Sequence, residues 1–476
     1  MVPAALCAQL AAIVGPDNLL SDRLSRVLYE YDGGVDRALP DLIVFPRCRD
    51  HVVEIVRAAR AARVPLVARG AGTGLSGGAV ARDGGIIVAL NRMRRILEVD
   101  VENARAVVEP GVVNLEFSQS IAASGFYFAP DPSSQRACTL GGNVAENSGG
   151  PHTLLHGVTV NHITGLELVL ADASIVTLGG KALDSPGWDL TGLMVGSEGT
   201  LALVTAITLK LTRLPEAVAT LLAVYDHVAD AAATVTALTS SGITPAACEM
   251  MDGFSLRAIE AATHAGYPLD AAAVLLIEVE GLREEVAEDS ARIEALCRRA
   301  SARSVRLAAD ARERDLLWSG RKNAFGAMGR IAPNNYVMDG VIPRTRIAEV
   351  LEQIDAIGQR HGFRTGNMFH AGDGNLHPLV FFDERAGELP RALACSRDIL
   401  HACVAVGGSI TGEHGVGIEK QDLMPWVFSP EDLAFMASIR AAFNPDGLLN
   451  PNKLLPSAHM CAEIRSDARL YQEQPL

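Results

Sequence analysis

Two histidines flank a turn signal in the segment MFHAGDGNLHPLVFFD, residues 368–383. Asp373-Gly374 is typical of a two-residue hairpin turn, and a turn centred there places His370 directly opposite His377. Directly opposed residues have Cβ atoms about 5 Å apart on one face of the sheet. That spacing suits two imidazole ligands on one metal ion, although an ordinary cross-strand histidine pair has the same pattern. Pro378 is expected where the strand ladder needs no N–H donor.

A carboxylate and a third histidine lie in GGSITGEHGVGIEK, residues 407–420. The surrounding glycines let the adjacent side chains of Glu413 and His414 point to different targets. Two histidines and one carboxylate leave open positions on a metal, as a catalytic site requires. His414 is then free to act as a general base, because a histidine pKa lies near neutral pH. The alternative is a solvated pair on a loop.

A glycine pattern predicts a second kind of chemistry in PLVARGAGTGLSGGAV, residues 65–80. Gly72, Gly74 and Gly77 match G-x-G-x-x-G, the Rossmann dinucleotide fingerprint. A Rossmann site needs a helix directly after the last glycine, but this chain reaches a strand-like IIVAL at 86–90 within a few glycine-rich residues. The block is therefore predicted to bind phosphate through backbone N–H groups in a different fold; the alternative is a tight turn between strands.

Two further glycine-rich blocks follow at 129–150 (APDPSSQRACTLGGNVAENSGG) and 192–211 (GLMVGSEGTLALVTAITLKL). Each lies beside strand-like sequence. Three such blocks indicate one extended cofactor that is contacted along its length, since a mononucleotide would need only one.

Periodicity predicts the elements that position these residues. The chain opens as β-α-β, with strands at 42–46 and 65–69 around a helix at 50–63. From about 217 to 425 the pattern is α+β. Strands are expected near 219–225, 273–280, 304–308, 336–342, 364–371 and 376–382, and helices near 227–240, 283–300, 309–330, 345–361 and 385–405.

Composition limits the possible functions. A length of 476 residues suggests two or more domains, and the net charge of -14 argues against nucleic acid as a partner. The eight cysteines form no C-x-x-C pattern, which argues against iron–sulfur, zinc–thiolate and disulfide frameworks. No basic signal-peptide start and no long apolar run are found, so a cytoplasmic protein is expected, with any contact to the inner membrane peripheral and made through partners.

The glycine blocks resemble the FAD-binding domain of the vanillyl-alcohol oxidase / p-cresol methylhydroxylase superfamily. The resemblance implies an α+β fold: a two-subdomain FAD-binding domain at 1–215, a substrate or cap domain with an antiparallel sheet at 216–425, and a C-terminal segment at 426–476 that returns to the FAD domain through LNPNK. No histidine lies between 52 and 151, so FAD is expected to be non-covalent. The residues expected to bind it are Arg69, Gly70, Ala71, Gly72, Thr73, Gly74, Ser76, Gly77, Pro130, Asp131, Ser134, Gly141, Gly142, Asn143, Ala145, Asn147, Gly149, Gly150, Gly196, Glu198, Gly199, Ile207 and Asn452.

HAGDGNLH and GEHGVG resemble motifs of FAD-linked 2-hydroxyacid dehydrogenases. The resemblance implies a divalent metal, with zinc expected, held by His370, His377 and Glu413, while His414 takes the substrate hydroxyl proton. Arg321, in WSGRKNAFGAMGR, would hold the substrate carboxylate through its bidentate guanidinium. The alternative for Arg321 is a salt bridge on a helix surface.

Within that family the sequence most resembles the flavin subunits of bacterial glycolate oxidases. This implies oxidation of a small D-2-hydroxy acid, glycolate in the first place, with the hydride passing to flavin N5 and electrons leaving to an iron–sulfur subunit and a second flavin-fold subunit. Val337 stands where enzymes acting on 2-hydroxyglutarate have lysine, which favours a monocarboxylate. The alternatives are a D-lactate dehydrogenase that works as a single polypeptide, a non-catalytic flavin-fold subunit and a metal hydrolase without flavin.

Overall fold

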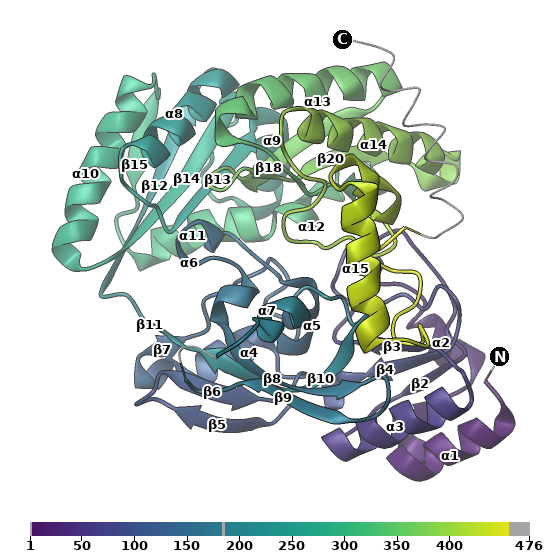
Figure 1. Ribbon diagram of the computed structural model, residues 1–476. Coiled ribbons are helices and arrows are strands. Elements are labelled where there is room, and N and C mark those ends of the chain that lie inside the picture. The colour runs from purple at the N-terminus through teal and green to yellow at the C-terminus, as the bar shows by residue number, and fades with distance from the viewer. Residues whose placement is uncertain (1, 183–185, 457–476) are drawn as a thin grey trace.

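The computed structural model describes residues 2–182 and 186–456, and its N-terminal half contains two larger sheets (Figure 1). The first has the order β1-β2-β4-β3, with β4 parallel to both β2 and β3. Its strands are β1 (Leu19–Leu20), β2 (Leu42–Val44), β3 (Leu66–Arg69) and β4 (Ile86–Ala89). Helices α1 (Ala4–Val14) and α3 (Arg49–Ala61) pack together beside it, and the buried stripe of α3 is its valine and isoleucine face.

The second sheet is antiparallel, in the order β5-β6-β10-β8-β9. Its strands are β5 (Ile96–Asp100), β6 (Arg105–Val108), β8 (Ile163–Leu170), β9 (Ile175–Gly179) and β10 (Ala202–Lys210). Its core includes residues of α4 (Asn114–Ile121), α5 (Leu140–Glu146) and α7 (Leu190–Met194). A short pair, β7 (Phe126–Tyr127) with β11 (Thr212–Arg213), leads to the C-terminal half.

A larger antiparallel sheet forms the C-terminal half, which we call the cap. Its main path is β15-β12-β14-β13-β18-β19-β17, and β20 joins β16 to β18. The strands are β12 (Ala217–Tyr225), β13 (Ala247–Asp252), β14 (Ala273–Gly281), β15 (Ser304–Leu307), β16 (Asn334–Val337), β17 (Gly340–Val341), β18 (Arg364–His370), β19 (Asn375–Leu376) and β20 (Pro378–Phe382).

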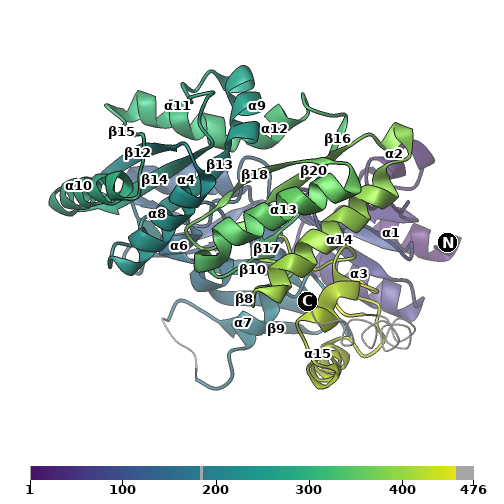
Figure 2. The same ribbon diagram turned by 90° about the horizontal axis from the view of Figure 1, so that it is seen from above.

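Helices cover both faces of the cap sheet (Figure 2). One face carries α8 (Val228–Ser240), α10 (Arg283–Arg299), α13 (Ile347–His361) and α14 (Leu389–Ala405); the other carries α9 (Gly253–Thr263), α11 (Ala311–Lys322) and α12 (Ala324–Met328). Burial on both faces explains why the first five residues of β14 read as a continuous apolar run, AVLLI, rather than an alternating one.

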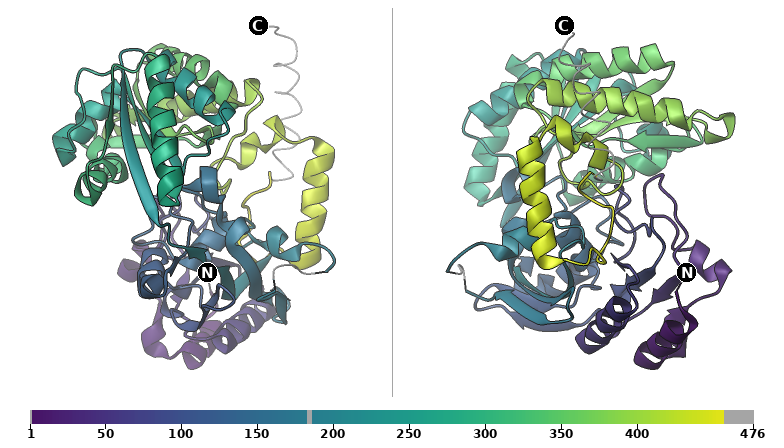
Figure 3. Two further views of the ribbon diagram at one scale, coloured as in Figure 1. Left: turned by 90° about the vertical axis from the view of Figure 1, so that its left-hand side faces the viewer. Right: turned by 45° about the vertical axis from the view of Figure 1, so that its right-hand side comes forward.

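The segment after the cap returns to the first sheet. Helix α15 (Pro430–Phe443) runs along both halves (Figures 1 and 3), and Leu449 then bridges to Leu66 of β3 in parallel. The Lys453 ammonium is buried and donates to the carbonyl of Val80 at 2.6 Å. The last described residues therefore fix the strand and the loop that surround the first glycine block.

No helix follows that block. After Gly77 and Gly78 the backbone turns directly into β4, which excludes the Rossmann arrangement. In the described ranges, no helix is both long enough and apolar enough to cross a membrane.

The two halves meet at a partly buried histidine. His152, beside α6 (Thr153–His156), contacts Asp131 at 2.8 Å and reaches across to Glu278 of β14 at 3.2 Å. It also stacks on Trp318 of α11, with ring centroids 5.6 Å apart. Burial alone would lower the pKa of His152, but the two carboxylates raise it well above its ordinary value.

We therefore expect the contribution of His152 to stability to depend on pH. A raised pKa in the folded protein means that the stabilisation is complete below about pH 6.5, the unfolded value, and is lost as pH rises through the folded value. The difference in melting temperature between wild type and His152→Gln should thus be largest in mild acid and shrink in alkali. A difference that stays constant across the pH range would contradict this assignment.

Candidate active site

The glycine blocks and the cap motifs line one cavity of about 620 Å³. Three parts of the chain line it: the first two glycine blocks together with Glu198 and Gly199, the loop at 33–37, and the cap. Among the residues expected to bind FAD, those on its wall are Gly70, Ala71, Gly72, Thr73, Gly74, Ser134, Gly142, Asn143, Ala145, Gly149, Glu198 and Gly199. His377, Glu413 and His414 lie on the same wall, so the two predicted chemistries face one space.

The other expected FAD residues have contacts within the fold. The Asn147 side chain accepts from Val160 N at 2.9 Å, and Asn452 donates to Asp83 at 2.7 Å. Asp131 is paired with His152, and Ile207 is a core residue of β10. Arg69, Ser76, Gly77, Pro130, Gly141, Gly150 and Gly196 also lie outside the described cavity wall.

Gly74 allows a direct test of the cavity as the flavin site. A Cβ added there meets Glu146 Oε1 only at 3.9 Å, and its φ is not in the left-handed region, so the protein itself tolerates a side chain. Gly74→Val should fold normally yet obstruct the cofactor. A steric cost of about 1–3 kcal/mol corresponds to about 5- to 150-fold weaker FAD binding. The ratio of flavin to protein absorbance measures it, with Gly329→Ala on the exposed cap as control; full flavin content in Gly74→Val would contradict the placement.

The predicted hairpin register is wrong by two residues. His370 pairs with Asn375, not with His377, and Gly374 N donates to His370 O at 3.1 Å to close a four-residue turn. A two-residue turn of the expected type needs positive φ at both Asp373 and Gly374, and only Gly374 has it, at 82°. A shift of two residues keeps every side chain on its face, so both histidines still point to the same side. Pro378 pairs with Asn367, and its carbonyl accepts from Met338 N.

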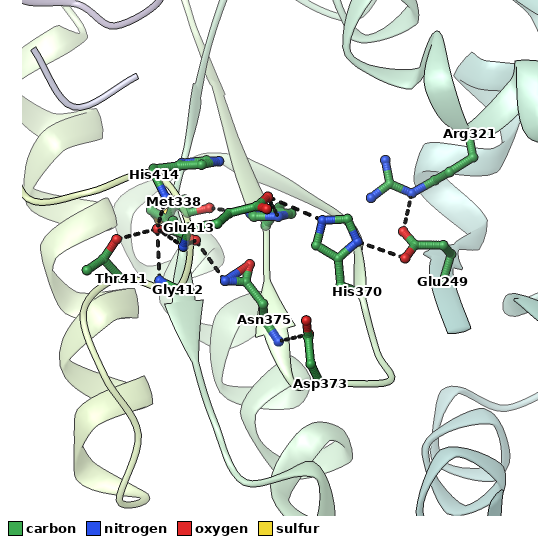
Figure 4. A network of polar contacts seen from close by, with 12 residues as sticks. Glu249, Arg321, Met338, His370, Asp373, Asn375, Thr411, Gly412, Glu413 and His414 are labelled. Carbon is green, nitrogen blue, oxygen red and sulfur yellow. Dashed lines mark hydrogen bonds and ion pairs between the residues drawn. The ribbon is translucent and has the colours of Figure 1, made fainter. Parts of the chain in front are cut away.

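Three side chains converge as a metal site would require (Figure 4). His370 Nε2 and His377 Nε2 lie 3.2 and 3.1 Å from the same oxygen, Glu413 Oε1. Ligands bound at about 2.0–2.1 Å in tetrahedral geometry lie about 3.3 Å apart, so the spacing fits a zinc-sized ion. Burial alone would raise the pKa of Glu413, but His370 and His377 hold it well below its ordinary value, as an ionised ligand needs.

The other ring nitrogens are already bonded. His370 Nδ1 contacts Glu249 Oε1 at 2.7 Å, and His377 Nδ1 contacts the Met338 carbonyl at 3.2 Å. Metal-binding histidines typically donate their second N–H to such acceptors, which leaves Nε2 free for the ion. The donor set therefore fits the divalent metal that the sequence predicted.

Asp339 holds the loop that presents Glu413 and His414. Its buried carboxylate accepts from the backbone N–H groups of Gly412, Glu413 and His414 at 2.9 to 3.2 Å, and it pairs with Lys420 at 3.4 Å. Burial alone would raise its pKa, but His414 and Lys420 contribute to a pKa of about 2. Asp339 also belongs to a second possible ligand group with His377 and His414, but its oxygens are occupied by these donors.

His414 stands beside the metal residues on the cavity wall. Its ring is parallel to that of His377, with centroids 5.0 Å apart and planes at 4°. Burial lowers the pKa of His414 to about 4, below the near-neutral value expected from the sequence, and the imidazole is therefore neutral near pH 7. Its buried Nδ1 has no hydrogen-bond partner within the described part of the chain. A neutral imidazole facing the cavity can accept a proton there.

Arg321 is not on the cavity wall. It is 2% exposed, and its Nε donates to Glu249 Oε2 at 2.7 Å. Its buried Nη2 has no partner among the described residues. The surface salt bridge considered as its alternative role is thus replaced by a buried pair, and the neighbouring Lys322 is the cation of α11 that lines the cavity.

Sequence reasoning missed the buried carboxylates around the site. Glu249 lies in AACEMM and Asp339 in VMDGVIP, each a single acid within an apolar stretch. Such an acid is costly to bury unless it is paired, so the pattern is itself a signal of a paired carboxylate. Glu146, also unassigned, lines the cavity; burial and then Glu198 raise its pKa well above the ordinary value.

Comparison with known proteins defines the class. Residues 40–179 match an FAD binding domain and residues 214–454 match the C-terminal domain of FAD linked oxidases. The chain belongs to the FAD-linked oxidase family and is an FAD-dependent oxidoreductase. Among solved structures, p-cresol methylhydroxylase with substrate bound superimposes with a TM-score of 0.80 at 18% identity, over 94% of this chain and 96% of that one. The expected fold class is thereby confirmed.

Curated relatives of this chain include glycolate oxidase subunits and a D-lactate dehydrogenase. The chain is 48% identical over 438 residues to glycolate oxidase subunit GlcD of Escherichia coli (strain K12), covering 92% of this chain and 88% of that protein. It is 39% identical to the subunit of the same name from Bacillus subtilis (strain 168), over 94% and 96% of the two chains. It is 30% identical to the mitochondrial D-lactate dehydrogenase [cytochrome] of Arabidopsis thaliana, over 97% and 81%.

Proposed function

We propose that this protein oxidises a small D-2-hydroxy acid to the 2-keto acid, with glycolate to glyoxylate as its main reaction. The observation that carries the proposal is the shared cavity: residues of the glycine blocks and His377, Glu413 and His414 line the same space. The names of the relatives, glycolate oxidase subunits and D-lactate dehydrogenases, support the substrate class.

Each group in the cavity has a role in this reaction. When bound, FAD supplies a two-electron acceptor, and a divalent metal held by His370, His377 and Glu413 supplies a Lewis acid that favours loss of the hydroxyl proton. His414 accepts that proton, because its imidazole is neutral and faces the same space. The loop fixed by Asp339 holds His414 in place before substrate arrives, which reduces the entropic cost of reaction.

The cap side of the cavity favours a small monocarboxylate. Its lining includes Lys322, Phe325, Tyr336 and Val337. The Tyr336 hydroxyl donates to Glu419 at 2.6 Å and is therefore engaged within the protein. Lys322 supplies one positive charge for one substrate carboxylate, and Val337 offers none for a second. D-lactate, one methyl group larger than glycolate, is the second candidate, supported by the lactate dehydrogenase relatives.

Electrons must then leave the reduced flavin. The described cysteines are free and scattered, without a cluster that could hold iron and sulfur. The relatives named as glycolate oxidase subunits support an assembly with partner subunits. In our proposal an iron–sulfur subunit and a second flavin-fold subunit, the partners expected from the sequence, receive the electrons.

Anaerobic bleaching of the purified flavoprotein tests the proposal. Glycolate should bleach the flavin absorbance at the highest rate, D-lactate more slowly, and L-lactate and 2-hydroxyglutarate little. Faster bleaching by D-lactate would favour the second candidate. Failure of every 2-hydroxy acid to bleach a fully flavin-loaded protein would overturn the proposed function.

A further inference from the structure

Glu249 occupies an unusual position beside the candidate metal site. It lies near the middle of β13, in the interior of the cap sheet, and is 0% exposed. Its neighbours in β13 are core residues such as Met250 and Met251. A charged group so deeply buried is costly unless it is paired, and Glu249 has two partners, one on each oxygen.

Each partner contacts a different oxygen of the Glu249 carboxylate. Oε1 lies 2.7 Å from His370 Nδ1, and Oε2 lies 2.7 Å from Arg321 Nε (Figure 4). The first contact follows from strand pairing, because Glu249 and His370 are direct partners across β13 and β18. The second contact comes from α11, which packs on the face of the sheet opposite α8 and α10.

From this geometry we infer that Glu249 is a positioning residue that orients His370 toward the metal, with Arg321 as its counter-charge. The inference rests on the proposed function, since it assumes that His370, His377 and Glu413 bind a metal. An ionised carboxylate can only accept hydrogen bonds, so His370 Nδ1 donates to it, and the Nε2 lone pair stays available for a metal held with His377 and Glu413.

Of the two groups that accept hydrogen bonds from the metal-binding histidines, only the Glu249 carboxylate can be changed by substitution. His377 donates its second N–H to a backbone carbonyl, which no side-chain substitution removes, whereas His370 relies on the Glu249 side chain. A carboxylate acceptor also makes the imidazole a stronger ligand than an amide acceptor does. Arg321 contributes by pairing the second oxygen, and in this role it acts through Glu249 and His370 rather than on the reacting atoms.

Glu249→Gln tests the inference, because it keeps the size of the side chain but removes its charge. We expect about 10- to 100-fold weaker metal binding, measured by competition with a chromophoric zinc chelator. The visible spectrum of the cobalt-substituted protein should shift as well, since it reports the ligand environment directly. Flavin content should equal that of wild type.

Glu278→Gln is the matched control. Glu278 is a buried glutamate of the adjacent strand β14, and it likewise contacts a histidine and a side chain of α11, His152 and Trp318, away from the metal residues. It should lose no metal affinity and leave the cobalt spectrum unchanged. Glu249→Asp keeps the charge and shortens the side chain by one methylene. Its metal affinity should lie between those of wild type and Glu249→Gln, and it provides the test if Glu249→Gln does not fold.

The outcomes separate the inference from the proposed function. Wild-type metal affinity and cobalt spectrum in Glu249→Gln would overturn the inference, as would an equal loss in Glu278→Gln. A wild-type protein that binds no divalent ion would overturn both the metal site and the inference. A wild type that binds metal but is bleached by no hydroxy acid would overturn the proposed function, while weaker metal binding by Glu249→Gln would still support the inference.

Discussion

Replacing His414 with asparagine should slow flavin reduction by glycolate by about 10²- to 10⁴-fold, the usual effect of removing a general base. His414 faces the cavity with a neutral imidazole and an unpartnered buried Nδ1, as far as the described residues show. The backbone N–H of residue 414 still bonds to Asp339 after the substitution, so the loop should keep its conformation. Rapid-mixing measurement of anaerobic flavin bleaching gives the rate.

Two controls test whether the lower rate of flavin reduction comes from losing the base itself rather than from losing flavin, metal or a histidine elsewhere. Flavin and metal contents of His414→Asn should equal those of wild type, because the proposed metal ligands are His370, His377 and Glu413. His227→Asn, at an exposed position before α8, controls for loss of a histidine elsewhere. Bleaching of His414→Asn at the wild-type rate would remove the residue from the mechanism.

The second large effect is expected at Glu413. Glu413→Gln removes the negative charge of the carboxylate on which both histidines converge, and an amide is a poorer zinc ligand than a carboxylate. We expect metal to be lost on dialysis and flavin reduction to fall by at least about 10²-fold, since Lewis-acid stabilisation amounts to several kcal/mol. Elemental analysis and bleaching kinetics of the same preparation measure both effects.

Both the backbone and the side chain of Glu413 are fixed by contacts. Asp339 fixes its backbone N–H, and the two imidazoles fix its carboxylate. Flavin content should therefore stay unchanged in Glu413→Gln, because the glycine blocks are intact. A variant that retains a full equivalent of metal and the wild-type rate would show that Glu413 is not a ligand.

The candidate site residues can be picked out from local patterns because the proposed chemistry depends on short motifs. The two hairpin histidines lie close to Glu413 and His414, as their motifs indicated, even though the hairpin register differs from the predicted one by two residues. The expectation that both histidines point to one side does not depend on that shift, because side chains in a strand alternate with a period of two. The glycine blocks were found for the same reason, since a backbone turn of positive φ demands glycine locally.

Long-range pairing could not be predicted from these patterns. Strand β13 was missed, because a short strand with a glutamate near its centre does not look like buried sheet. Its partner β18 lies more than a hundred positions further along the sequence, so nothing local indicated that Glu249 meets His370. The glycine blocks likewise do not reveal which members face a ligand: Gly142 lines the cavity, while Gly141 packs on Pro110.

The helix expected at 309–330 is a second case in which the sequence pattern alone was not sufficient. It is two helices, α11 and α12, separated at Asn323, which ends the first and begins the second. Arg321, in the last turn of α11, therefore points into the protein toward Glu249, while Lys322 reaches the cavity. Helical periodicity alone places both cations near the site and does not decide between them.

The central claim is that one cavity joins FAD to a metal-assisted oxidation of a hydroxy acid. The most direct test is anaerobic flavin bleaching by glycolate with one preparation in three states: as purified, after removal of metal with a chelator, and after return of one equivalent of zinc. The account predicts rapid bleaching, then a loss of at least about 10²-fold at unchanged flavin content, then recovery. Bleaching that stays rapid after elemental analysis shows the metal to be gone would contradict it.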